Sequence, residues 1–348
     1  MVKLTKKDMD VKGKVAVLIS LITTIGLVYW FILQPPEALS GTSKEPYKQQ
    51  RDKTNDEVKD IRKLALNQNE REPQAVFNSE DEIGEEWCKV ERNFSPQQRK
   101  NSQNEASEWD VQRGNILIPD YHSAFESHNA GLIAPYVDIE PDKLLLSAKS
   151  DDKFALITLL QRDDAAKEKK DWAAYRLMLL GNTSLALGHL VMKEVSLAKH
   201  KFAEGSIVTK EIENHMLNSL AYVSYGIARM DASALRAYVI ATNPKHLSHN
   251  FSPDEALDKI DSAAINARKN DLVEFINSER AQLHLNPISD IKIPEIARKE
   301  FDISIAILYA SFGSQIAESK NLMKISEHDL SRKSDCVSEF LSRLTQSS

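Results

Sequence analysis

Glycine is scarce in this sequence, with 11 residues in 348. No Gly-x-Gly-x-x-Gly and no Gly-x-x-x-x-Gly-Lys-Ser/Thr segment occurs, which argues against a nucleotide-binding fold. Valine, isoleucine and threonine seldom alternate with polar residues, so strands are not expected. Alanine, leucine, lysine, glutamate, serine and asparagine dominate instead. This composition predicts an all-α protein.

One long stretch near the N-terminus has no charged residue. Residues 15–33 read VAVLISLITTIGLVYWFIL. A helix of about 20 apolar residues spans the hydrocarbon layer of a bilayer. Tyr29 and Trp30 lie near its end, where aromatic side chains prefer the membrane interface, and Pro35 and Pro36 follow as helix breakers. We therefore predict a transmembrane helix that contacts membrane lipid over residues 15–33.

Basic residues flank this segment on one side. Five lysines and two aspartates precede it, whereas the residues just after it hold few charges. The positive-inside bias predicts a cytoplasmic N-terminus and export of the rest. We expect a bacterial source, which places the anchor in the inner membrane and the bulk of the chain in the periplasm. The charged residues before the segment are Lys3, Lys6, Lys7, Asp8, Asp10, Lys12 and Lys14.

Two other interpretations of the segment remain open. A signal peptide could be cleaved after about Ser40, in Ala38-Leu39-Ser40. However, a signal peptide has an apolar core of roughly 7 to 15 residues, and the stretch here is longer, which favours an uncleaved anchor. The other alternative, a buried helix of a soluble protein, is disfavoured by the preceding lysines and the following prolines.

The remainder of the chain is acidic. It keeps 40 of the 45 basic and 49 of the 51 acidic side chains, a formal net charge of about −9. Nucleic acid binds to concentrated basic surfaces, so we expect no nucleic-acid partner. The same acidity disfavours docking on an anionic lipid surface.

Helix start and stop signals divide the chain. Ser95 before Pro96 is typical of a helix N-terminus. A similar pair, Ser252 and Pro253, predicts a helix that runs to about residue 269. We expect a basic cytoplasmic N-terminus, a transmembrane helix, a stalk with a short helix, an N-terminal helical cap and a helical-hairpin domain, at residues 1–14, 15–33, 34–78, 79–140 and 141–345.

Two stretches of the hairpin region are similar to each other. Residues 148–160 align with residues 179–191, and in both a polar turn interrupts a run of alanine and leucine. A weaker third copy is predicted at residues 219–226. Periods of 30 to 40 residues built from two helices are typical of α-solenoids, whose hairpins stack to share a core. The alternative is a chance similarity between helices rich in alanine and leucine.

These segments resemble a known class of repeat proteins. Asp151-Asp152 with Ala155-Leu156, the block GNTSLALGHL at 181–190 and LAYVSYG at 220–226 are similar to Sel1-like, TPR-related repeats of exported bacterial proteins. The resemblance covers residues 144–229. It implies an irregular α-solenoid-like domain that binds proteins and has no catalytic residues. The chain departs from the Sel1 pattern in its spacing and its few glycines, so no particular partner is implied.

Few residues suggest catalysis or metal binding. His246-x-x-His249 supplies two metal ligands where three or four are needed, so we predict a solvated loop and no metal or cofactor. Glu318-Ser319 is similar to the Glu-Ser pair of lytic transglycosylases, in which the acid protonates a glycosidic oxygen. The Gly-Leu-Met-Gln stretch of those enzymes is absent, so Glu318 is interpreted as an exposed helix residue.

The two cysteines, Cys88 and Cys336, both follow the predicted anchor. In an oxidising compartment such a pair could form a disulfide that joins the first exported helices to the last one. The alternative is two separate buried thiols, which behave as small apolar side chains. Spacing alone does not decide between them.

Binding of an unidentified envelope protein is the function that the sequence favours. Aromatic residues concentrate at binding hot spots, and those of the hairpin region could form a contact surface or fill its core. The competing hypotheses are an anchored peptidoglycan-processing enzyme or accessory factor, and a tether that spaces a partner from the membrane. The candidate contact residues are Trp172, Tyr175, His189, Tyr222 and Tyr225.

Overall fold

The computed structural model describes residues 91, 93–118, 129–243, 251–325 and 336. All of them belong to one unit of the chain, Phe77–Ser348, and the other unit, Met1–Val76, lies outside the described residues. The predicted cytoplasmic segment, membrane helix and stalk therefore lie outside them too. Within the described ranges, no helix has the length and apolarity to cross a bilayer.

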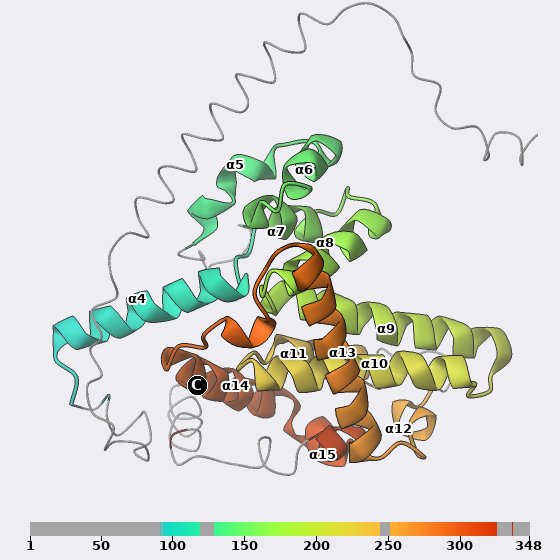
Figure 1. Cartoon of the computed structure of the whole chain (residues 1–348). Helices are drawn as coiled ribbons and strands as arrows, with labels where there is room; N and C mark the ends of the chain where they lie inside the picture. The colour runs from blue at the N-terminus through green and yellow to red at the C-terminus, as the bar shows by residue number, and fades with distance from the viewer. Residues whose placement is uncertain (1–90, 92, 119–128, 244–250, 326–335, 337–348) are drawn as a thin grey trace, which may run out of the picture. The chain divides into compact units, whose positions relative to one another are not determined.

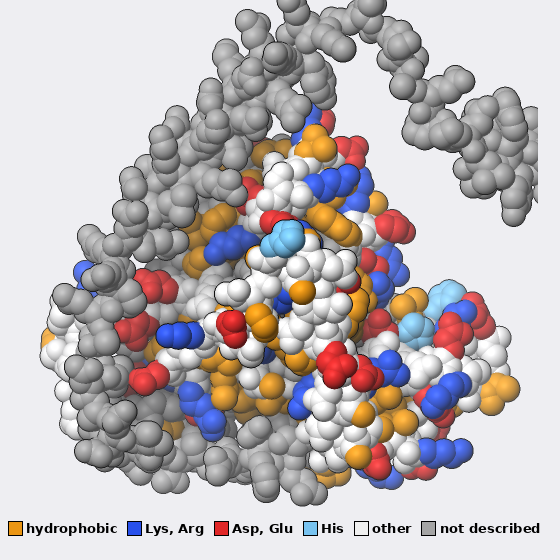
Figure 2. Space-filling model, in the orientation of Figure 1, with side chains coloured by type: hydrophobic (Ala, Val, Ile, Leu, Met, Phe, Trp, Pro, Cys, Tyr) orange, Lys and Arg blue, Asp and Glu red, His pale blue; other side chains and the backbone are white. Residues whose placement is uncertain are grey.

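Regular structure in the described ranges is entirely helical, and these ranges contain no strand (Figure 1). The all-α class predicted from composition is confirmed. Acidic and basic side chains are interspersed on the face drawn in Figure 2. That face therefore presents no continuous basic surface of the kind that nucleic acid requires.

Three consecutive helical hairpins form the middle of the unit. The two helices of each are joined by four residues, one of which has a left-handed backbone: Asp151 (φ 62°), Gly181 (φ 86°) or Met230 (φ 54°). A left-handed residue near a helix end lets the chain reverse and satisfies the last carbonyl groups. The hairpins pair α6 (Pro141–Ala148) with α7 (Lys153–Gln161), α8 (Lys167–Leu179) with α9 (Ser184–Gly205), and α10 (Lys210–Ala228) with α11 (Ser233–Ala241).

The first two hairpins have the predicted spacing. α8 ends 31 residues after α6, and α9 begins 31 residues after α7. The prediction of a third copy at residues 219–226 is wrong, because these residues form no hairpin and lie inside the continuous helix α10. The third turn comes at residues 229–232. The similar apolar segments lie at the start of α9, which has 22 residues, and in the middle of α10, which has 19. They therefore occupy different positions along the two helices.

α10 is surrounded by other helices. Between Leu217 and Ile227 every residue except Asn218 is buried. A helix that is apolar on all sides must be covered on all sides, and α9, α11 and α13 (Ser262–Gln282) all contact it. Two short helices, α12 (Pro253–Ala256) and α15 (Lys320–Ile325), cover more of it.

The remaining helices agree with the sequence in part. The start of α4 (Pro96–Arg113) is as predicted, because Ser95 and Gln98 form a reciprocal capping box there. The single helix predicted over residues 253–269 is wrong: α12 ends at Ala256, and α13 begins after Asp261, whose carboxylate caps it. α14 (Ile296–Glu318) packs against α4, and the short elements η1 (Ala130–Leu132), α5 (Ala134–Val137) and η3 (Ile288–Asp290) complete the described structure.

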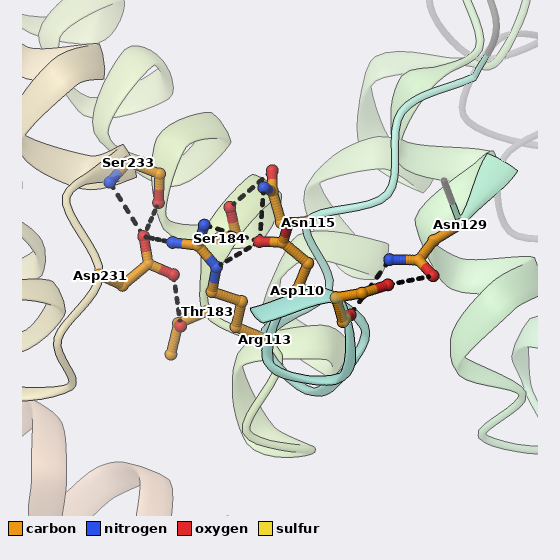
Figure 3. Close-up of polar contacts among 9 residues, drawn as sticks. Asp110, Arg113, Asn115, Asn129, Thr183, Ser184, Asp231 and Ser233 are labelled. Carbon is orange, nitrogen blue, oxygen red and sulfur yellow. Dashed lines mark hydrogen bonds and ion pairs between the residues drawn. The ribbon is translucent and has the colours of Figure 1, made fainter. Parts of the chain in front are cut away.

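A buried ion pair joins the end of α4 to the hairpin turns (Figure 3). Arg113 is 8% exposed, Asp231 is completely buried in the α10–α11 turn, and their Nη1 and Oδ1 atoms lie 3.7 Å apart. Asp110 also binds Arg113, with Nη2–Oδ1 at 2.7 Å. Burial opposes the charge of Arg113, but the two carboxylates outweigh it and raise the pKa of the guanidinium.

Asp231 uses its remaining lone pairs on the neighbouring turns. The Thr183 hydroxyl, in the α8–α9 turn, donates a hydrogen bond of 2.8 Å to Oδ2. The backbone amide of Ser233, at the start of α11, donates one of 2.9 Å to Oδ1. One carboxylate therefore fixes two turns and the end of α4 relative to one another.

Replacing Asp231 by alanine should destabilise the protein by about 3–5 kcal/mol, because it leaves Arg113 buried with one carboxylate fewer and Thr183 without its acceptor. The free energy of unfolding from urea denaturation measures the loss. Asp271→Ala, which removes an exposed carboxylate on α13, should change the stability by less than about 0.5 kcal/mol. Equal effects of the two substitutions would show that the buried pair is not needed.

Candidate functional site

Polar side chains of α8, α9 and α10 meet along one line, which we name the polar seam. Spacings of three or four residues place Asp171 with Tyr175, His189 with Lys193, and His215 with Asn218 and Tyr222 on one face of their helices, whereas Glu194 directly follows Lys193. Two of its carboxylates each accept a hydrogen bond from a histidine. The seam consists of Asp171, Tyr175, His189, Lys193, Glu194, His215, Asn218 and Tyr222.

Asp171 is the centre of the first half of the seam. Its Oδ1 lies 2.7 Å from Nε2 of His189, and its Oδ2 lies 3.0 Å from Nζ of Lys193. The Lys193 ammonium also lies 5.2 Å from the centre of the Tyr175 ring, within cation–π range. Burial opposes ionisation of Asp171, but the bonds from His189 and Lys193 outweigh it and lower the pKa of the carboxyl.

Glu194 is the centre of the second half. It is 5% exposed, and its Oε2 lies 2.7 Å from Nδ1 of His215 and 3.3 Å from Nδ2 of Asn218. A carboxylate on a largely buried helix face is stable only with such partners. The imidazole and the amide therefore hold Glu194 in place between α9 and α10.

Two tyrosine hydroxyls connect the halves. Tyr175 and Tyr222 approach each other with their oxygens 3.4 Å apart. Burial raises the pKa of Tyr222 far above its ordinary value, and Tyr175 and Glu194 raise it further. Tyr222 therefore keeps its proton at physiological pH, and either hydroxyl can donate the hydrogen bond to the other.

The aromatic residues proposed from sequence divide into two groups. Trp172 is 36% exposed, and Tyr175 and His189 are partly buried, so these three reach the surface beside the seam. Tyr222 and Tyr225 are 6% and 2% exposed and belong to the core. These two tyrosines therefore cannot form part of an exposed contact surface in this structure.

Sequence reasoning missed most of the polar members of the seam. Asp171 stands four residues before Tyr175, and His189 four residues before Lys193, so each helix signals a polar face on its own. The partners across helices, such as Glu194 with His215, depend on how α9 and α10 are aligned. Local spacing cannot supply that alignment.

The other candidate residues lie elsewhere. Glu318 is exposed on α14, as predicted. His246, His249 and Cys88 lie outside the described residues. Cys336 is completely buried and disulfide-bonded. Cys88 is the only other cysteine of the chain, and its pairing with Cys336 stays a prediction.

The seam consists of paired charges and hydrogen-bond donors, and its groups are not arranged for a reaction. In the described ranges, no three His, Cys, Asp or Glu side chains come together as metal ligands. The hydrogen-bond partners of His189 and His215 are carboxylates, whereas a hydrolytic nucleophile would need a hydroxyl or thiol beside the imidazole. The arrangement suits recognition of a polar partner beside the exposed Trp172.

Comparison with known proteins adds no relative. No protein-family model matches the chain, and neither does any curated protein or solved structure. Membership of a Sel1-like class stays a prediction from the residues quoted above. Function must therefore be inferred from the residues of this chain.

Asp171→Asn should lower the stability by about 1–2 kcal/mol at neutral pH, because two charge-assisted hydrogen bonds are weakened. Because the pKa is lowered in the folded state, the carboxylate contributes to the free energy of unfolding at pH values above its ordinary pKa of about 3.9. This contribution disappears as the pH falls through the lower folded-state pKa. The difference from the unmodified protein, measured by denaturation across pH, should therefore shrink in acid. Asp163→Asn, at an exposed site, is the control, and a difference independent of pH would contradict the assignment.

Proposed function

We propose that this protein is held in the bacterial inner membrane by residues 15–33 and carries a helical domain in the periplasm that binds another envelope protein. The lysines before residue 15 support this orientation. The uncharged length of the segment supports membrane insertion. The bound protein is unidentified, and no cofactor is part of the proposal.

The disulfide at Cys336 is the observation that supports export most directly. Disulfides persist in oxidising compartments such as the bacterial periplasm, and they are rare in the cytosol. Cys336 is completely buried, so the bond belongs to the packed interior. In a reducing cytosol such a disulfide would be unusual.

The hairpin architecture supports binding as the activity. Stacked helical hairpins present extended surfaces because each unit contacts only its neighbours. On α8, Trp172 is exposed next to Asp171, and Tyr175 follows one turn later. An aromatic anchor flanked by fixed polar groups is the usual composition of a hot spot. The exposure of Glu318 disfavours the alternative of glycan cleavage, which requires a carboxylic acid in a desolvated site.

Peptide mapping without reductant should yield one cross-linked peptide that contains residues 88 and 336. Replacing both cysteines by serine should lower the free energy of unfolding by roughly 2–5 kcal/mol, because a long closed loop is released in the unfolded chain. Denaturation of the oxidised and reduced proteins measures the same difference. Two thiols that both react with an alkylating agent in protein from intact cells would contradict an exported location.

A photoreactive amino acid at position 172 should cross-link a specific protein in intact cells. The same group at Phe275, which is 46% exposed on α13, is the matched control and should not. Once the partner is known, Trp172→Ala should weaken binding by about 2 kcal/mol or more, as for a hot-spot residue, or roughly 30-fold. Equal cross-linking at both positions, or unchanged affinity, would exclude this surface.

A further inference from the structure

Arg280 is a buried cation that has no ionic partner in the part of the chain that the structure describes. It stands near the end of α13 and is 4% exposed. Its Nε donates a hydrogen bond of 2.6 Å to the backbone carbonyl of Asn286, and its Nη1 donates one to the backbone carbonyl of Leu179. Within the described ranges it forms no ion pair with a carboxylate. Buried charges are normally paired, because desolvation is costly.

A second arginine lies near the first. Arg229 follows the end of α10 and is partly buried. It donates a hydrogen bond of 3.0 Å to the backbone carbonyl of Ile291. It too has no carboxylate partner among the residues that the structure describes. Burial lowers the pKa of Arg280, and the positive charge of Arg229 lowers it further, whereas Tyr225 and Asp290 act in the opposite direction. Asp290 is exposed and outside ion-pair distance.

Tyr225 adds a hydrogen-bond donor for which the described residues provide no acceptor. It stands one helical turn before Arg229 on α10, and it is 2% exposed. Its hydroxyl is buried, and no partner for it is found in the described part of the chain. Burial raises the pKa of Tyr225 to about 12, although Arg229 and Arg280 pull it down. The hydroxyl is therefore protonated at physiological pH, and a buried donor of this kind ordinarily has an acceptor.

We propose that Arg229, Arg280 and Tyr225 form a binding site for an oxyanion, either a carboxylate or a phosphate group. An oxyanion would pair with two guanidinium groups and accept the hydrogen bond of the phenol. The planar guanidinium suits both kinds of anion, because it can donate two parallel N–H···O hydrogen bonds to two oxygens of one carboxylate or phosphate. Arg229 is only partly buried and would form the entrance to the site.

The site is separate from the polar seam. Its residues come from the end of α10, the end of α13 and the segment at 286–291, whereas the seam involves the earlier turns of α8, α9 and α10. A structural role alone accounts for the bonds that Arg229 and Arg280 make to backbone carbonyls. It does not account for the fact that, among residues 91–325 and 336 as far as they are described, Tyr225 has no acceptor and neither cation has a carboxylate partner.

The test is titration of the full-length protein, in non-ionic detergent, with sodium phosphate and separately with sodium acetate. Ionic strength is held constant with chloride, so that general screening does not change. We expect one or both anions to raise the melting temperature in a saturable way, as a ligand of the folded state does. A rise in melting temperature with phosphate alone or with acetate alone identifies the chemical class of the ligand. Calorimetry gives the dissociation constant.

Two variants keep the fold and weaken the site. Arg229→Gln and Tyr225→Phe should each raise the dissociation constant about tenfold or more, since each removes a direct hydrogen bond to the anion. The matched controls are Arg236→Gln, at an exposed site on α11, and Tyr238→Phe, in the core of the same helix. Arg280 is left unchanged because it is almost completely buried and makes two carbonyl bonds, whereas Arg229 is partly buried and makes one. The melting temperature of each variant without added anion shows whether the fold is kept. No saturable effect of either anion, or equal affinity in all four variants, would overturn the proposal.

Discussion

The packing of the hairpins depends on one buried charge pair. Arg113, at the end of α4, and Asp231, in the α10–α11 turn, are more than a hundred residues apart in the chain, and both are buried. Such a pair adds little net stability, because desolvation offsets the attraction, but either partner alone is very costly. Any other arrangement of α4 against the turns would separate Arg113 from Asp231 and leave a buried charge without this partner. The pair therefore selects a single arrangement of α4 and the second and third hairpins.

Both proposed sites are built on the elements that this pair aligns. The polar seam requires α8, α9 and α10 at fixed heights, because Glu194 must reach His215 and Tyr175 must reach Tyr222. The oxyanion site requires the end of α10 beside the end of α13. In the seam every charge has a partner within the protein, whereas at Arg280 the cation has none among the described residues. The first arrangement suits a contact surface, and the second suits a small anion.

Local signals predicted some helix ends, such as the start of α4, and missed others, such as the end of α12, and they predicted the tertiary partners poorly. The capping box at Ser95 and the turn at Gly181 depend on neighbouring residues, so they can be recognised in the sequence. The third hairpin was misplaced because α10 has no breaker at the aligned position. The burial of Tyr225 and the isolation of Arg280 depend on which helices cover them, and single-sequence periodicity does not contain that information.

The central position of α10 has a consequence for biosynthesis. Its sides are covered by α9, which precedes it, and by α13 and α15, which are made later. A nascent chain that has emerged only as far as α11 would expose the side of α10 that α13 and α15 cover in the complete domain. Such exposed surface favours aggregation or capture by chaperones. Maturation of the domain must therefore wait for its C-terminal third, and premature termination there would yield a sticky, protease-sensitive product.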